Sequence, residues 1–325
     1  MTLVNSVSSW RSIQKENFVH LKPLLDFLEL SMEQRKKICY SSKFVLNLPK
    51  RIAHKIEKGT LNDPILLQFV PLKLEEEVSE GFSLHPVQDD LFRSETRYLQ
   101  KYKGRALLLL TSACAMHCRY CFRQNFDYGD SSDFSNELAR IEKDTSLHEI
   151  ILSGGDPLSL GDRKLKQLLD QIEKIPHITK VRFHTRFPIG IPERLDADFL
   201  ELLNNRRYKV YFVFHINHAK ELDREIIAAI SNLQKLGVIT LNQAVLLKGI
   251  NDNYETQQEL HLALVDCGIL PYYLHQLDRV EGAAHFEVNP DKGRKIIQHL
   301  RSHLPGYAVP SYVQEIPKEP NKTPL

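Results

Sequence analysis

Short apolar runs alternate with segments of helical periodicity from Arg105 onwards. A continuous apolar run such as Ala106–Leu110 is typical of a parallel strand that is buried on both faces. The runs predict strands at Ala106–Leu110, His148–Ser153, Lys180–Thr185, Lys209–His215, Ile239–Leu246 and Leu270–Leu274. Helical spacing predicts helices between them at Asn136–Lys143, Lys164–Ile172, Ala197–Leu203, Glu221–Leu236 and Glu255–Asp266.

Strands that alternate with helices indicate an α/β fold with a parallel sheet and right-handed crossovers. Six strands are too few for a complete eight-stranded barrel, so we expect a partial (β/α)6 barrel. The barrel core is expected at residues 105–288, and a helix and strand segment at residues 289–325.

Residues 1–104 carry a different pattern and predict a mostly helical N-terminal extension. Leu21–Leu30 has helical spacing, and Ser31 followed by Gln34 resembles a capped helix start. Ile52–Ile56 predicts a further helix, and the acidic run Glu75–Glu77 is expected to be a solvated helix face or turn.

Polar residues follow or end five of the six predicted strands of the barrel, and the fifth strand contains two. They comprise a cysteine loop, Ser153-Gly154-Gly155-Asp156-Pro157, Thr185 with Arg186, His215 with Asn217 and His218, Asn242 with Gln243, and His275 with Gln276 and Asp278. The carboxyl ends of parallel strands meet at one mouth, so these groups predict one active site. Each of them alone is equally compatible with a turn or a hydrogen-bonded core residue.

Three of the five cysteines lie in the stretch Cys114-Ala-Met-His-Cys118-Arg-Tyr-Cys121. Thiolates spaced C-x3-C-x2-C favour three irons of a [4Fe–4S] cluster, which leaves the fourth iron open to a ligand. A small zinc site is the alternative, with His117 as the only local fourth ligand. His117 lies inside the cysteine run, where folding back onto a shared metal is awkward, so the spacing favours the cluster.

Composition narrows the class of protein. The chain has 43 basic and 41 acidic residues and a net charge of +2, which predicts neither a nucleic-acid nor a membrane partner. No apolar run is long enough to span a bilayer, and the N-terminus lacks the pattern of a signal peptide. Clustered cysteines beside the solitary Cys39 and Cys267, which we expect to be buried thiols, predict a reducing cytoplasm.

Gly154 and Gly155 follow a predicted strand and precede a helix, where glycine allows backbone to approach a ligand closely. An ordinary turn with Asp156 and Pro157 is the alternative. The pattern is neither G-x-G-x-x-G nor a Walker loop, which excludes dinucleotide and nucleoside-triphosphate sites of those kinds.

The cysteine spacing, with Tyr120 before the last cysteine, and the Gly-Gly-Asp-Pro turn resemble the radical S-adenosylmethionine enzymes. Longer stretches resemble the lysine 2,3-aminomutase family, over roughly Arg105 to the C-terminus. They are Cys118-Arg-Tyr-Cys-Phe-Arg123, Leu152-Ser-Gly-Gly-Asp156, Asn242-Gln-Ala-Val-Leu-Leu-Lys-Gly-Ile-Asn-Asp252, Pro271-Tyr-Tyr-Leu-His-Gln-Leu-Asp278, Gly306-Tyr-Ala-Val-Pro310 and Asn321-Lys-Thr-Pro324.

The resemblance implies migration of the α-amino group of lysine to C3, which yields β-lysine. The chain is similar to the compact branch that makes β-lysine for modification of elongation factor P, because it lacks the C-terminal zinc-binding cysteines of longer members. The implied partners are lysine, a reductant such as flavodoxin or ferredoxin, and, through the pathway, elongation factor P and its ligase. An aminomutase acting on glutamate or another amino acid, and a non-enzymatic iron–sulfur or zinc protein, are the alternatives.

The resemblance also assigns residues to S-adenosylmethionine and the cluster. Cys114, Cys118 and Cys121 would ligate three irons, and the cofactor would chelate the fourth. Residues implied to contact S-adenosylmethionine are Gly154, Gly155 and Asp156 at its methionine end, His215 and Gln243, and Tyr120 beside its adenine.

The remaining implied roles concern pyridoxal 5′-phosphate and the substrate. Lys322 would form the Schiff base, and Ser159 and Arg186 would contact the cofactor phosphate. Arg123 would pair with the substrate carboxylate, and Asp278 and Glu315 with its distal ammonium. The family usually has aspartate where Glu315 stands and a glycine run where this chain has Lys318-Glu-Pro-Asn321. It also often has further arginines where Gln124 and Asn125 follow Arg123.

Overall fold

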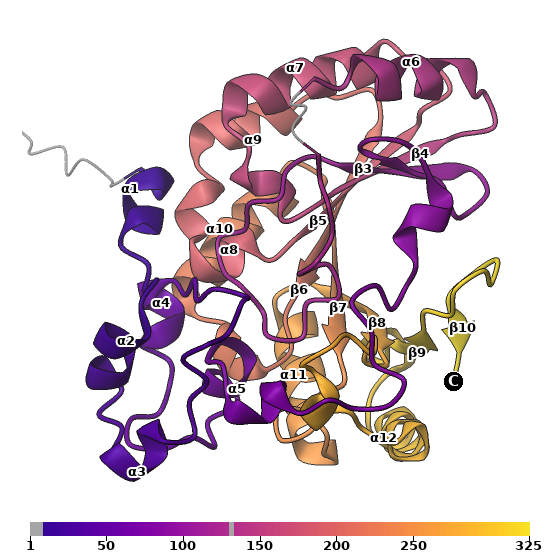
Figure 1. The fold of residues 1–325 in the computed structure, drawn as a ribbon. Coiled ribbons are helices and arrows are strands. Elements are labelled where there is room, and N and C mark those ends of the chain that lie inside the picture. Colours follow the sequence, from indigo (N-terminus) through magenta and orange to yellow (C-terminus); the bar gives the residue numbers. More distant parts are fainter. Residues whose placement is uncertain (1–8, 130–132) are drawn as a thin grey trace, which may run out of the picture.

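A computed structural model describes residues 9–129 and 133–325 of the chain (Figure 1). Ten strands form one sheet in the order of the sequence, β1 to β10. The central six run parallel and are β3 (Arg105–Leu109), β4 (Glu149–Ser153), β5 (Lys180–Thr185), β6 (Lys209–His215), β7 (Ile239–Val245) and β8 (Leu270–His275). These six strands match the predicted ones to within a residue or so at each end.

The sheet is open, because no pairing joins β1 to β10 in the described part of the chain. β9 (Ser311–Gln314) adds a parallel strand beside β8, and β10 (Thr323–Pro324) pairs antiparallel with β9. At the other edge, β1 (Arg93–Glu95) and β2 (Tyr98–Leu99) pair antiparallel and lead into β3. The predicted partial barrel is therefore confirmed, with short antiparallel additions at both edges.

Helices cover the outer face of the strands (Figure 1). They are α6 (Ser135–Lys143), α7 (Asp162–Glu173), α8 (Phe187–Gly190), α9 (Ala197–Leu203), α10 (Arg224–Gln234), α11 (Tyr254–Asp266) and α12 (Pro290–His303). Side-chain oxygens of Asp196, Asp223 and Asn253 accept backbone N–H bonds and so fix where α9, α10 and α11 begin. Short 3-10 turns are η3 (Pro157–Ser159), η4 (Pro192–Arg194), η5 (Ala219–Glu221), η6 (Ala284–Phe286) and η7 (Gly306–Ala308).

The N-terminal segment contains short helices, which group at one side of the sheet in Figure 1. They are α1 (Trp10–Lys15), α2 (Leu21–Phe27), α3 (Met32–Arg35), α4 (Lys50–Ala53) and α5 (Leu66–Phe69), followed by η1 (Lys73–Glu76) and η2 (Asp89–Phe92). Ser31 and Gln34 form the predicted capping box at the start of α3. The prediction of a mostly helical segment missed β1 and β2, because strands this short show no period in the sequence.

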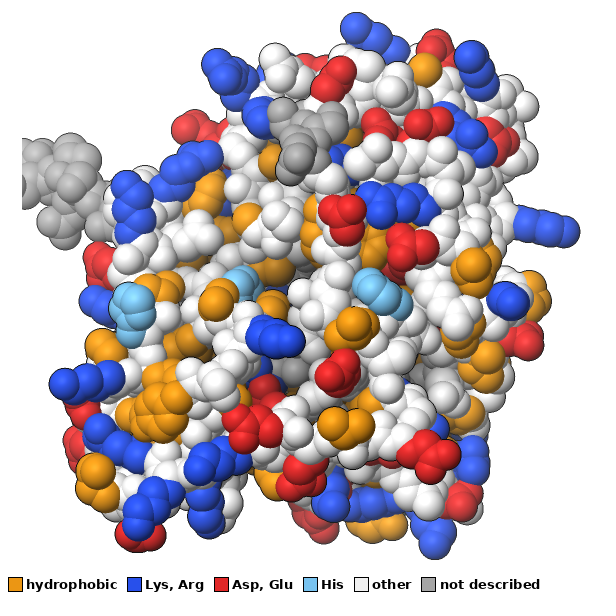
Figure 2. Space-filling model, viewed as in Figure 1, with side chains coloured by type: hydrophobic (Ala, Val, Ile, Leu, Met, Phe, Trp, Pro, Cys, Tyr) orange, Lys and Arg blue, Asp and Glu red, His pale blue; other side chains and the backbone are white. Residues whose placement is uncertain are grey.

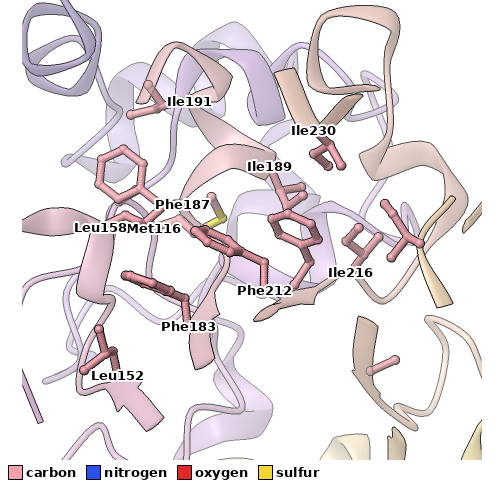
Figure 3. Packing of buried hydrophobic residues seen from close by; sticks show 14 of the residues in the cluster. Met116, Leu152, Leu158, Phe183, Phe187, Ile189, Ile191, Phe212, Ile216 and Ile230 are labelled. Atoms are coloured by element: carbon pink, nitrogen blue, oxygen red, sulfur yellow. The ribbon is translucent and has the colours of Figure 1, made fainter. Parts of the chain in front are cut away.

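One apolar core joins the N-terminal segment to the barrel. Phe183 and Phe212 stack at a centroid distance of 4.7 Å in its centre (Figure 3). The edge of Trp10 in α1 meets the ring of Phe187 at 5.4 Å, and Leu24 of α2 belongs to the same cluster of buried side chains. The N-terminal segment is thus packed into the core that supports the carboxyl ends of the strands.

In the acidic run Glu75–Glu77, Glu76 and Glu77 are exposed as predicted, whereas the side chain of Glu75 is mostly buried. The Nε of Arg119 donates to Glu75 Oε1 at 2.9 Å, and their side chains are 2% and 10% exposed. A buried cation requires a counter-ion, which is why this acid is held out of water. Cys39 is buried as expected, whereas Cys267 is half-buried.

Within residues 9–129 and 133–325, none of the helices has the length and apolar character that crossing a bilayer requires. On the face drawn in Figure 2, side chains of both charges are interspersed, and neither sign gathers into a patch.

Candidate active site

A cavity of about 320 Å³ lies at the carboxyl ends of the parallel strands. Of the residues that the sequence analysis selected, it is lined by Cys114, Cys118, Tyr120, Cys121, Arg123, Gly154, Gly155, Asp156, Arg186, His215, Gln243, Asp278, Glu315 and Lys322. The cysteine loop and the C-terminal lysine, which are far apart in the sequence, therefore share one cavity. Ser159 lies outside this lining, in η3, and its hydroxyl is buried without a partner among the described residues.

The N-terminal segment holds the cysteine loop in place. Asn47 donates from Nδ2 to the carbonyl of Cys114 at 3.0 Å, and Asn17 donates from Nδ2 to the carbonyl of Ala115 at 2.8 Å. His117 Nδ1 lies 2.9 Å from the carbonyl oxygen of Val45. The sequence analysis gave this segment no role, because amides that contact a backbone so distant in sequence leave no local pattern.

The three thiols suit an iron–sulfur cluster. Burial raises the pKa of Cys121 to about 11, and Cys118 raises it further. Burial also raises the pKa of Cys114, as do the nearby Asp156 and the other two cysteines, so the three sulfurs lie close enough to influence each other. A metal centre is the partner that lets such thiols ionise.

No group of three His, Cys, Asp or Glu side chains in the described ranges converges on one point for a single metal ion. In a [4Fe–4S] cubane each thiolate would bind a different iron, so the three cysteines would not need to meet at one ion. His117 bonds to the Val45 carbonyl and stacks on Phe44 at 4.9 Å. Its ring is therefore engaged by the N-terminal segment, which disfavours the zinc alternative.

Arg186 is buried at the cysteine end of the cavity. Its Nη1 donates to Cys118 Sγ at 2.8 Å and to the Tyr120 hydroxyl at 2.6 Å. Its Nη2 donates to Gln68 Oε1 at 2.6 Å and to Glu221 Oε2 at 2.7 Å. Both terminal nitrogens of Arg186 therefore have protein partners, and Ser159 lies outside the cavity lining. The implied contacts of Arg186 and Ser159 with the cofactor phosphate stay predictions.

Replacing Arg186 with Met is expected to destabilise the fold, because Glu221 is 0% exposed and would lose its counter-ion. Leaving one buried charge unpaired costs about 3 kcal/mol, which a lower denaturation midpoint of the iron-free protein would reveal. The double variant Arg186→Met, Glu221→Gln should recover most of the loss. Equal midpoints for the single variant and the wild type would contradict the prediction.

The Gly154-Gly155-Asp156 turn packs against the chain that leads into Cys114. The Gly155 N–H donates to the carbonyl of Thr111 at 2.6 Å, and the Asp156 N–H donates to that of Ala113 at 2.8 Å. The Asp156 carboxylate accepts bonds from the Thr185 hydroxyl at 2.7 Å and from the backbone N–H groups of Arg186 at 2.7 Å and Phe187 at 2.9 Å. Burial raises the pKa of Asp156 to about 6, against the effect of these hydrogen bonds. Asp156 therefore joins the ends of β4 and β5 and holds the loop beside the cysteines.

Gly155→Ala is expected to lower the thermal midpoint, because the added Cβ would meet the carbonyl oxygens of Ala113 at 2.5 Å and Ser112 at 2.6 Å. Overpacking against backbone costs about 1–3 kcal/mol. Gly306→Ala is the matched control, since no atom lies within 4 Å of the position of its added Cβ. Melting curves of the two variants test the prediction, which fails if their midpoints coincide.

Tyr120, His215 and Gln243 lie side by side at the centre of the cavity wall. The Tyr120 hydroxyl is 3.1 Å from His215 Nε2, and His215 pairs with Gln243 in the register of β6 and β7. Burial holds the pKa of His215 well below its usual value, and Arg186 lowers it further, so the imidazole is neutral. The implied contacts of these residues with S-adenosylmethionine stay predictions.

A hairpin brings Lys322 into the cavity. Thr323 pairs with Gln314, which places Lys322 beside Glu315 across the turn between β9 and β10. Lys322 Nζ lies 2.7 Å from Glu315 Oε2, with side chains 25% and 12% exposed. In this turn Lys318 adopts a left-handed conformation with φ of 69°, so the turn forms without the family's glycine run.

Glu315 is surrounded by cations and a hydroxyl. It pairs with Lys101 as well as Lys322, and the Tyr102 hydroxyl donates to it at 2.8 Å. Burial raises the pKa of Glu315, but Lys322, Lys101 and Tyr102 outweigh it and hold the pKa below the usual value. Glu315 is therefore the counter-ion of Lys322 in this structure, a relationship that the sequence analysis did not predict.

Asp278 follows β8 on the same wall. Burial raises its pKa to about 7, with Lys322 lowering it and Glu315 raising it. Arg123 lies on the cysteine loop side, where its Nε donates to Asp89 Oδ2 at 2.8 Å. The cavity thus offers an acid near Lys322 and a guanidinium near the cysteines.

Several cavity residues were missed by the sequence analysis. They are Lys101, Tyr102, Arg105, Arg182, His184 and Tyr273. Arg105 on β3 and Arg182 on β5 add guanidinium groups to the wall that carries Lys101, and guanidinium and ammonium groups suit a phosphate. A reactive lysine with cations nearby fits pyridoxal 5′-phosphate. The signal that could have found Arg182 is its position inside an apolar strand, and that for Arg105 is its position at the start of one.

The fold, the three-cysteine loop and the cavity define a radical S-adenosylmethionine enzyme. A family model described as "4Fe-4S single cluster domain" matches residues 102–187. L-lysine 2,3-aminomutase of Escherichia coli is 41% identical, over 93% of this chain and 90% of that protein. The same-named protein of Haemophilus influenzae is 38% identical, over 99% and 96%. The chain belongs to the lysine 2,3-aminomutase family.

Two further similarities are a curated protein and a solved structure. Glutamate 2,3-aminomutase of Clostridioides difficile is 33% identical, over 83% of this chain and 65% of that protein. A solved radical SAM methyltransferase from Sphaerobacter thermophilus is 16% identical, with a TM-score of 0.47 over 67% of this chain and 68% of that one.

Proposed function

We propose that this protein is an L-lysine 2,3-aminomutase, which moves the α-amino group of L-lysine to C3 and forms β-lysine. Relatives of that name at 41% and 38% identity support this activity. The observation that carries the proposal is one cavity wall that joins the cysteine loop to Asp278, Glu315 and Lys322. Lys322 would hold the coenzyme, and the acids beside it would pair with the second ammonium group of lysine. The cysteine loop lines the same cavity.

Three cofactors belong to this proposal. Cys114, Cys118 and Cys121 would hold the [4Fe–4S] cluster, the wall with Gly154, His215 and Gln243 would bind S-adenosylmethionine, and Lys322 would bind pyridoxal 5′-phosphate. When bound, the cluster and S-adenosylmethionine would supply one-electron chemistry at an unreactive C–H bond of the substrate. Pyridoxal 5′-phosphate would supply a carbonyl carbon that carries the migrating nitrogen.

The chain's own residues orient the substrate. The Arg123 guanidinium is held by Asp89 at 2.8 Å and by the Ser153 hydroxyl at 3.4 Å, and its terminal nitrogens would donate to the α-carboxylate. Asp278 offers a carboxylate to the distal ammonium. Glu315 Oε2 holds the Lys322 ammonium at 2.7 Å and is the nearest acceptor for a proton leaving Nζ. Because the cavity is largely lined by buried side chains, water has restricted access to reactive groups within it.

The competing substrate is glutamate, which one relative's name raises. A distal carboxylate would be repelled by Asp278 once that acid is ionised, and by Glu315. The acids therefore favour lysine.

The test is an anaerobic assay of the reconstituted protein with S-adenosylmethionine, pyridoxal 5′-phosphate and either amino acid. Mass spectrometry is expected to identify β-lysine and no β-glutamate. Formation of 5′-deoxyadenosine without β-lysine would contradict the substrate, and a colourless preparation without iron would contradict the enzyme class.

The cellular setting forms the finer part of the proposal. We expect a flavodoxin or ferredoxin to reduce the cluster, and β-lysine to supply a ligase that modifies elongation factor P. Free cysteines support a reducing compartment, which we take to be the cytoplasm. We also propose that the chain divides into an N-terminal extension up to residue 104, a barrel core up to residue 288 and a C-terminal segment.

A further inference from the structure

His184 is a cavity residue with no assigned role. It lies on β5 and lines the cavity together with Arg182 and Arg186, whereas Val181 and Phe183 point into the core on the other face. Its Nε2 is buried and has no hydrogen-bond partner among the residues that the structure describes.

The surroundings of His184 are cationic. Burial holds the pKa of His184 well below its usual value, and Arg182, Lys322, Arg123 and His275 lower it further. The imidazole is therefore neutral and offers one N–H donor and one acceptor nitrogen. Leaving a buried polar nitrogen unsatisfied costs about 1–3 kcal/mol, which a ligand in the cavity would recover.

Other histidines in the described ranges differ from His184. His215 lies beside the Tyr120 hydroxyl, and His261 Nε2 beside Gln257 at 3.1 Å. His285 also lacks partners for its nitrogens, but it does not line the cavity. His184 therefore combines an unpartnered buried nitrogen with a place on the cavity wall.

We propose that His184 is a positioning residue for pyridoxal 5′-phosphate and hydrogen-bonds to a polar atom of its pyridine ring. The inference rests on the proposed function. The coenzyme's carbonyl carbon belongs at Lys322, and its phosphate dianion belongs with the cavity cations Arg105 and Arg182. Arg182 also pairs through Nε with Glu149 at 3.0 Å, which leaves its terminal nitrogens for a phosphate. The ring joins these two groups, and His184 lies under the electrostatic influence of both Lys322 and Arg182. A neutral imidazole suits a polar ring atom better than it suits a dianion.

The test titrates pyridoxal 5′-phosphate into protein without a reconstituted cluster and records Kd and the absorption maximum. His184→Phe is expected to raise Kd at least tenfold and shift the maximum, which corresponds to loss of about 1.4 kcal/mol. His184→Gln keeps a donor and an acceptor and should stay within about threefold of the wild type, a range of under 1 kcal/mol. His261→Gln is the control for a buried histidine elsewhere and should match the wild type.

Thermal melting separates positioning from a structural role. Without coenzyme, His184→Phe should melt at or above the wild-type temperature, because it removes an unsatisfied polar group. With coenzyme, its stabilisation should shrink in proportion to the weaker binding. A lower melting temperature of His184→Phe without coenzyme would instead assign a structural role and overturn the inference.

One contrary result is a wild type that shows a coenzyme band dependent on Lys322 while His184→Phe keeps the wild-type Kd and absorption maximum. That result would overturn the inference about His184 and leave the proposed function standing. Absence of any Lys322-dependent band in the wild type would overturn it together with the coenzyme part of the proposed function.

Discussion

Lys322→Ala is expected to abolish β-lysine formation, with a loss of activity of at least about a thousandfold. The variant lacks the amine that the turn between β9 and β10 places beside Glu315. The absorption band of the lysine-bound coenzyme should disappear in the same variant. Anaerobic turnover and an absorption spectrum measure the two effects.

Lys318→Ala is the matched control, since Lys318 lies in the same turn and is exposed. It should keep both the activity and the band. Turnover by Lys322→Ala within tenfold of the wild type would show that another amine serves the coenzyme.

Asp278→Asn is expected to lower kcat/KM for lysine about a thousandfold, mainly through KM. The amide keeps the size of the side chain but removes the charge that faces the distal ammonium. Loss of one partner of a buried charge pair costs about 2–5 kcal/mol, which sets this magnitude. Steady-state kinetics measure it, and Asp291→Asn, whose side chain is 73% exposed, is the control. A KM for lysine equal to that of the wild type would remove Asp278 from the substrate site.

The same residue predicts a pH dependence. Burial, with Glu315, raises the pKa of Asp278 to about 7 despite Lys322, so the carboxyl is protonated below pH 7 and ionised above it. The kcat/KM for lysine should therefore rise about tenfold per pH unit below 7 and level off above. Asp278→Asn should lack this rise of kcat/KM below pH 7. If the rise persists in the variant, another group causes it.

The protonation of Asp278 affects folding stability in the opposite direction to kcat/KM. Because the folded pKa of Asp278 lies above its unfolded value near about 4, protonation favours the folded state. This contribution is complete below about pH 4 and is lost as the pH rises through about 7. The free wild-type protein should therefore lose stability relative to Asp278→Asn across that range, which denaturant titrations at several pH values measure.

Much of the barrel could be predicted from the sequence because its signals are local. Apolar runs at β3 to β8 and helical spacing between them depend on neighbouring residues alone, and the polar residues at the strand ends then converge by topology. The three cysteines are also local. Lys322 became visible only through its resemblance to a family motif, since a lysine near a chain end is ordinarily solvated.

What escaped prediction depends on contacts between distant segments. The position of Arg186 at the end of a predicted strand does not show that Glu221 and Gln68 accept its hydrogen bonds. Lys101 and Tyr102 follow β2, and Glu315 follows β9, near the other edge of the strand order. They meet only because the sheet forms a partial barrel, which no local pattern shows. Glu75 looked solvated because its partner Arg119 is remote in sequence.

The amides of Asn17 and Asn47 have a consequence for the order in which the metal centre is assembled. They fix the carbonyls of Ala115 and Cys114 across separations of 98 and 67 residues, so the loop takes its shape only after the N-terminal segment has docked. A zinc finger folds around its ion, whereas these contacts lead us to expect that the polypeptide shapes this loop before iron and sulfide bind. The protein without its cluster is then expected to stay folded.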